Sequence, residues 1–131
     1  MSRIVEIPSS LGELLDKISI LEIKAERIHD TAKLNSVRHE LALLASLEKQ
    51  HLAVFASDLN GLKSELKQVN EALWQLEDDI RECEREGRFE AHFIQLARSV
   101  YRQNDRRAAV KRAINLAAGS DIVEEKSYSA Y

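Results

Sequence analysis

The chain carries an unbroken heptad pattern of apolar residues between Leu52 and Cys83. Its a and d positions are filled by Leu52, Phe55, Leu59, Leu62, Leu66, Val69, Leu73, Leu76, Ile80 and Cys83. Spacings of three and four place side chains on one face of an α-helix, so at least one long helix must bury this stripe against other helices. The sequence therefore predicts an all-α fold.

Length and composition support the same class and limit the partners. The chain has 131 residues, of which 44% are hydrophobic, 31% charged and 5% aromatic, a balance typical of one helical domain. A formal net charge of −3 argues against DNA or RNA as the main partner. Cys83 is the single cysteine and is interpreted as a small core residue. Because we find neither a secretory signal nor a run of roughly 20 apolar residues, we expect a cytoplasmic protein without a membrane span.

Capping and turn residues divide the chain into four helices. Ser10 and Glu13 form a capping box at the start of the first helix, and Asp30 is a good N-cap for the second. Gly87 is a natural left-handed end for the third helix. The expected helices cover about residues 11–28, 31–54, 58–86 and 89–118, with extended arms at 1–9 and 121–131.

The connections between these helices predict their arrangement. Turn-forming residues favour a break between the second and third helices within Ala53 to Gly61, although one helix running through this segment is the alternative. Short connections make consecutive helices antiparallel, so we expect an antiparallel four-helix bundle with short extended arms. The first helix is shorter than the last two, which would leave apolar surface uncovered at one end and favour a second subunit.

Two Glu-x-x-His patterns, Glu26 to His29 and Glu48 to His51, are similar to the metal-binding motifs of di-iron bundles. In an antiparallel hairpin that turns at Asp30, the two patterns lie roughly 27 Å apart along the helix axis. The metals of a binuclear site lie only ~4 Å apart. We therefore expect no metal site and no cofactor.

The fourth helix has a local excess of basic residues, which are Arg98, Arg102, Arg106, Arg107, Lys111 and Arg112. One interpretation is a helix that binds nucleic acid or phosphate. The third helix is rich in Glu and Asp, however, and antiparallel neighbours of opposite charge would neutralise each other. This second interpretation is favoured, so nucleic acid is not the expected partner.

Polar residues on faces that should be buried form the candidate site. They are Glu22, Arg38, Asn70, Trp74, Glu77, Tyr101, Asn104, Arg107 and Lys111. Counting outward from Asp30 places Glu22 level with Arg38 and predicts an ion pair between them. Isolated charges in a core are costly, so these groups must pair, reach solvent or receive a ligand. The favoured interpretation is an internal network that fixes helix register; the others are a cationic cavity in which Arg107 and Lys111 hold an anion, and a docking face for another protein.

Four segments carry a family resemblance: IPSSLGELLDKISILEIK at 7–24, VNEALW at 69–74, SVYRQNDRR at 99–107 and EEKSY at 124–128. With them, the chain resembles a bacterial domain family of unknown function over nearly its whole length. Domains of that family occur alone or beside glycosyltransferase-like modules, so the resemblance implies a link to surface-polysaccharide assembly. It brings no catalytic motif and no residue roles.

The leading functional hypothesis is a non-enzymatic helical interaction or scaffold module that self-associates and serves another protein. Its basis is the long heptad stripe in a chain without a reactive constellation of side chains. The alternative is a bundle that binds a small metabolite bearing phosphate or carboxylate. An enzyme of chorismate-mutase-like architecture is the nearest analogy, and it is one of fold alone. No catalytic residue is predicted.

Overall fold

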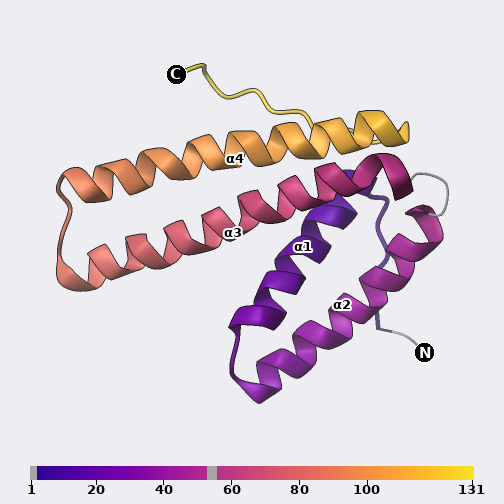
Figure 1. The fold of residues 1–131 in the computed structure, drawn as a ribbon, viewed down its shortest axis with the longest axis horizontal. Coiled ribbons are helices and arrows are strands. Elements are labelled where there is room, and N and C mark those ends of the chain that lie inside the picture. The colour runs from indigo at the N-terminus through magenta and orange to yellow at the C-terminus, as the bar shows by residue number, and fades with distance from the viewer. Residues whose placement is uncertain (1–2, 53–55) are drawn as a thin grey trace.

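The computed structural model describes residues 3–52 and 56–131. They form four helices without a strand: α1 (Leu11–Arg27), α2 (Thr31–Leu52), α3 (Ala56–Glu86) and α4 (Ala91–Ala118) (Figure 1). The predicted all-α class is confirmed. The break between the second and third helices was predicted within Ala53 to Gly61; Ala56 to Gly61 belong to α3, and residues 53–55 lie outside the described residues.

The helix ends are fixed by the residues that the sequence indicates. The Ser10 hydroxyl oxygen accepts a hydrogen bond of 3.1 Å from the backbone N–H of Glu13, and the Asp30 carboxylate accepts one of 2.9 Å from Lys33 N–H. Gly87 has a φ of 65°, in the left-handed region that glycine adopts without a steric penalty. These three end signals are confirmed.

The helices form two hairpins of unequal length (Figure 1). The shorter hairpin, α1 with α2, crosses the longer hairpin, α3 with α4, near the end that is far from Gly87. The helix α1 packs against the other three helices, and α3 packs against α4. The main core lies at this crossing and consists of Leu15, Ile18, Leu59, Leu66, Val110 and Ile114.

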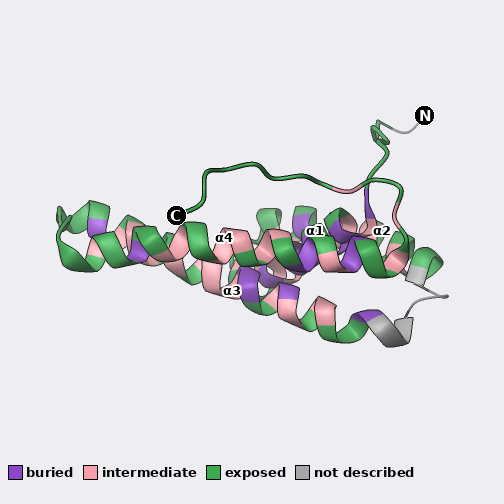
Figure 2. Cartoon of the chain, turned by 90° about the horizontal axis from the view of Figure 1, so that it is seen from above, coloured by how far each residue is buried: buried purple, intermediate pink, exposed green. Residues whose placement is uncertain are grey.

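The apolar stripe of α3 extends beyond the helix that covers it. Leu59, Leu66 and Val69 are at most 1% exposed, because α1 lies over this part of the hairpin. Leu73, Leu76 and Ile80 continue the same stripe but are only half-buried, and Figure 2 shows the projecting hairpin mostly exposed or half-buried. One end of the hairpin therefore lacks a third helix, as the short first helix predicts.

Candidate functional site

A buried carboxylate lies where α1 meets the longer hairpin. The side chain of Asp16 on α1 is 1% exposed. It accepts a hydrogen bond of 2.9 Å from Nε of Arg107 on α4 and another from Nη2 of the same guanidinium. The guanidinium thus binds the carboxylate with two parallel hydrogen bonds, the strongest arrangement for this pair.

Asn70 connects the same carboxylate to α3. Its amide nitrogen donates to Asp16 Oδ1 over 2.8 Å and to Ser19 Oγ over 2.7 Å. Ser19 Oγ itself donates to the backbone oxygen of Asp16 over 2.8 Å. Both amide hydrogens of Asn70 are used, whereas its amide oxygen has no hydrogen bond to any residue that the structure describes.

Lys111, one helical turn after Arg107, completes the cluster, which we call the polar network (Asp16, Ser19, Asn70, Arg107 and Lys111). Its ammonium nitrogen lies 2.7 Å from a Glu13 oxygen, 3.0 Å from a Glu124 oxygen and 3.6 Å from Asp16 Oδ2. Three carboxylates therefore face two cations, which leaves no positive charge unmatched.

The pKa values follow from this pairing. Burial alone would lower the pKa of Lys111, but hydrogen bonds to Glu13 and Glu124 and the charge of Asp16 together raise it above the ordinary 10.5. Hydrogen bonds to Asp16 raise the pKa of Arg107 in the same way. Both cations consequently stay charged across the physiological range.

The helices α1 and α4 approach closely at Gly12. Its backbone N–H donates to Asn115 Oδ1 over 2.7 Å, and Asn115 is only 1% exposed. A Cβ atom at this position would lie 2.6 Å from the backbone oxygen of Lys111. A residue without a side chain is therefore required for α1 to reach the polar network.

Beside the network lies a crevice of about 400 Å³ lined by residues of α1, α3 and α4, and we call its three polar residues next to the network, Asn70, Asn104 and Arg107, the floor. Its lining consists of Ile20, Ile23, Asn70, Leu73, Trp74, Glu77, Asp78, Arg81, Asn104 and Arg107. The structure thus brings five residues of the predicted site to one surface, namely Asn70, Trp74, Glu77, Asn104 and Arg107.

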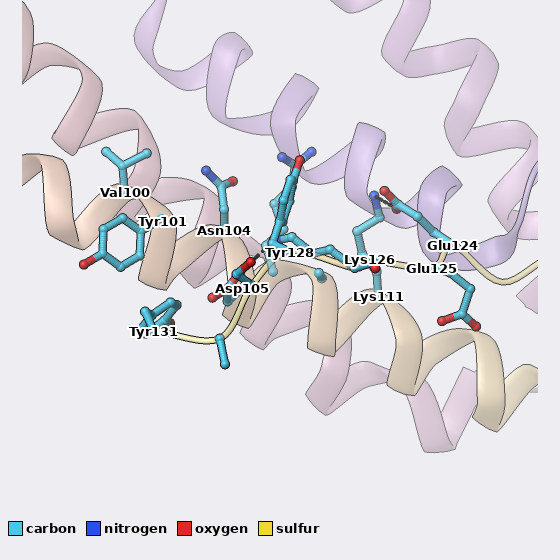
Figure 3. A pocket seen from close by; sticks show the side chains of 15 residues that line it. Val100, Tyr101, Asn104, Asp105, Lys111, Glu124, Glu125, Lys126, Tyr128 and Tyr131 are labelled. Carbon is cyan, nitrogen blue, oxygen red and sulfur yellow. Dashed lines mark hydrogen bonds and ion pairs between the residues drawn. The ribbon is translucent and has the colours of Figure 1, made fainter.

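A second hollow, a groove of about 1110 Å³, lies between α4 and the arm formed by residues 121–131. Figure 3 shows the arm along α4, with Glu124 beside Lys111 and Tyr131 beside Tyr101. The ring centroids of the two tyrosines are 4.9 Å apart. Asn104 and Arg107 line both hollows, so the crevice and the groove are parts of one surface.

Two residues of the predicted site lie elsewhere. The Glu22 carboxylate is 3.9 Å from the ammonium of Lys67 on α3, and Arg38 is exposed on α2 without a partner among the described residues. The predicted ion pair between Glu22 and Arg38 is therefore wrong. Counting outward from Asp30 gave their height along the hairpin, but the side of α1 that carries Glu22 faces α3.

Asp16, the residue that connects the whole network, was missed by the sequence analysis. A signal was available, because Gly12, Asp16, Ser19 and Ile23 repeat at spacings of four, three and four and form a second stripe on α1. All four are buried. Because this stripe contains small and polar residues, its sequence resembles that of a solvent-exposed helix face.

The polar network is built from hydrogen bonds and ion pairs. Among residues 3–52 and 56–131, no group of His, Cys, Asp and Glu is placed to hold a metal ion. The thiol of Cys83 is buried in the α3–α4 seam, 1% exposed. Within the same described ranges, no helix has the length and apolarity that crossing a bilayer requires.

Comparison with known proteins identifies the family of the chain. Residues 4–131 match the model of a family described as "Family of unknown function (DUF6165)". No curated protein and no solved structure matches the chain. The chain belongs to this family of unknown function.

Proposed function

We propose that this member of the DUF6165 family is a non-enzymatic helical interaction module that pairs with a second copy of itself. The pairing surface is the projecting end of the α3–α4 hairpin, residues 80–98, which we call the distal hairpin. The observation that supports this is the apolar stripe of α3, which continues beyond the part of the helix that α1 covers.

Apolar side chains at the distal hairpin are open to solvent. Phe89 is 50% exposed and Ile94 53% exposed. Phe93 packs edge-on against Phe89 with ring centroids 5.3 Å apart, and Ile80 is half-buried. Two helices alone bury little apolar surface, so a second hairpin laid against this one would complete a four-helix core.

Charge favours a second copy as the occupant. The distal part of α3 carries Glu84 and that of α4 carries Arg98, and neither side chain has a partner among the described residues. In a two-fold symmetric pair each surface meets itself, so the unpaired Glu84 of one copy can lie against the unpaired Arg98 of the other. Opposite charges on the two helices of one hairpin make such a surface self-complementary.

The test is sedimentation of the full chain at micromolar concentrations, with Ile94→Glu as the disrupting variant. Leu116→Glu is the matched control, because Leu116 is 64% exposed on the same helix but outside the distal hairpin. We expect the native chain and the control to sediment as dimers and Ile94→Glu as a monomer with unchanged helix content. A monomeric native chain, or equal dissociation by both variants, would contradict the proposal.

The alternative, an anion site at Arg107 and Lys111, receives no support from their surroundings, because every ion-pair partner of these two cations is a carboxylate. An added phosphate or carboxylate would therefore meet two cations whose charge is already matched by carboxylates. The link to surface-polysaccharide assembly that the resemblance implies stays a prediction, in which the module would serve a protein of that machinery.

A further inference from the structure

We propose that the crevice between α1 and α3 binds an uncharged carboxamide group attached to an apolar group. This inference does not depend on the self-association proposed above. It follows from three properties of the crevice: unused hydrogen-bonding atoms in its floor, a charge balance without excess positive charge, and apolar walls.

The floor offers one acceptor and several donors that have no partner. Asn70 is 4% exposed and lines the crevice, and its amide oxygen accepts no hydrogen bond among the described residues. Arg107 uses Nε and Nη2 for Asp16, so Nη1 keeps its two hydrogens. The amide of Asn104, which is half-buried at the same floor, is also without a partner in the described chain.

This set of atoms selects for a group that both donates and accepts. A carboxamide can donate its N–H to the Asn70 oxygen, and its carbonyl, with two lone pairs, can accept from both the Arg107 guanidinium and the Asn104 amide. A carboxylate or a phosphate dianion has no hydrogen to donate, so it would leave the Asn70 oxygen without a ligand partner and lose one hydrogen bond relative to the carboxamide.

The charges around the crevice give a second reason to expect an uncharged ligand. The guanidinium of Arg107 is matched by Asp16, and Arg81 is paired with Glu77. Asp78 has no partner among the described residues, but the guanidinium of Arg27 lies 5.9 Å from the centroid of the Trp74 ring, so the charges around the crevice balance. A balanced site offers no net positive charge to attract an anionic ligand and sets no electrostatic barrier against a neutral one.

The walls define what the carboxamide is attached to. Ile20, Ile23, Leu73 and Trp74 supply apolar surface, and the volume of about 400 Å³ is within the range of small-ligand pockets. A group about the size of a leucine side chain can pack against Leu73 and the Trp74 ring while its amide reaches the floor. Peptide segments and small free amides both present such a combination.

Trp74 is the only tryptophan of the chain, so its fluorescence reports on the crevice directly. The probes are 4-methylpentanamide and 4-methylpentanoate, which share one apolar group and have similar size, but only the first carries a carboxamide and only the second a charge. We expect a saturable change with the neutral probe at millimolar concentrations and at least about tenfold weaker binding of the anion. A capped tripeptide with leucine at its centre separates the sources: tighter binding indicates a peptide segment, and equal binding indicates a small amide.

Variants connect the signal to the floor. Asn104→Ala removes a side chain without a described partner, so the fold is retained and the affinity for the amide should fall about fivefold or more. Asn35→Ala, at an exposed position of α2, is the matched control and should bind as the native chain does. Ile94→Glu should also bind normally, which separates this site from the dimer surface. A linear change without saturation, tighter binding of the anion, or full binding by Asn104→Ala would overturn the proposal.

Discussion

A single buried carboxylate determines the polar interior of this chain. An unpaired charge in a core costs several kcal/mol, so Asp16 is tolerated only because Arg107, Asn70 and Lys111 surround it. The three partners come from α3 and α4, whereas Asp16 is on α1. The network therefore fixes how α1 lies on the longer hairpin, in addition to satisfying each charge.

Replacing Asp16 by Asn tests this role, since the change keeps the volume and removes the charge. Arg107 and Lys111 would then face one carboxylate fewer, and removing one partner of a buried pair typically costs about 3–5 kcal/mol. We expect the free energy of unfolding in urea to fall by about 3 kcal/mol. Asp121→Asn, at an exposed position outside the helices, is the control and should change it by less than about 0.5 kcal/mol.

At the scale of single residues, the sequence predicts the buried cation Arg107 better than its carboxylate partner Asp16. Arg107 interrupts the apolar stripe of α4, so its position alone indicates a buried charge. Asp16 interrupts no such stripe, because its burial depends on the angle at which α1 crosses the hairpin. The crossing angle of two helices is not encoded in the pattern of either one. The sequence therefore indicates the burial of Asp16 only weakly, through a glycine and a serine at helical spacing from it.

At the scale of the helices, the start of α1 serves two purposes. Ser10 caps the helix as the capping box predicts. Glu13 does not return a hydrogen bond to Ser10, however, and its carboxylate binds Lys111 on α4. The same turn contains Gly12, whose N–H binds Asn115. The first turn of α1 is therefore a docking point as well as a helix start.

Gly12→Ala should be destabilising although alanine is the better helix former. The new Cβ would lie 2.6 Å from the Lys111 backbone oxygen and 2.8 Å from Asn115 Oδ1. Because helix backbones move little, we expect the free energy of unfolding to fall by about 2 kcal/mol. Gly61→Ala is the matched control, since its Cβ would meet nothing within 4 Å. The free energy of unfolding of that variant should rise by up to about 1 kcal/mol, because alanine has the higher helix propensity. Stabilisation by both substitutions in urea unfolding would show that α1 and α4 are not in close contact.

The heptad pattern predicts the helices but not their crossing. The stripe from Leu59 to Cys83 correctly indicates one long α3 with a buried seam. A bundle of nearly parallel rods would need partners of similar length, whereas α1 has 17 residues and α3 has 31. The shorter hairpin therefore covers one end only, and the uncovered remainder is where we propose that a second copy pairs.

For the whole molecule, the arm at 121–131 is held to α4 by contacts near the surface. Glu125 binds Arg112 over 2.9 Å, and Lys126 binds Asp105 over 2.7 Å. Hydrogen bonds from Lys126 and Tyr131 lower the pKa of Asp105 below its ordinary 3.8. The ion pair between Asp105 and Lys126 is thus present above about pH 3.8 and is lost as the pH falls through the lowered pKa of Asp105.

Removing residues 121–131 should therefore leave the helical fold intact. Exposed ion pairs contribute little and are screened by salt, and Lys111 keeps Glu13 and Asp16 after Glu124 is gone. We expect the melting temperature to fall by about 5 °C or less at low salt, and the difference to shrink at about 0.5 M salt because ions screen the same pairs. A larger loss that salt does not reduce would mean that the arm is held by apolar packing, with the Tyr101–Tyr131 contact as its centre. Tyr131→Ala and Tyr131→Phe in the full chain separate the two cases, since both remove the hydrogen bond to Asp105 but only the alanine removes the ring contact.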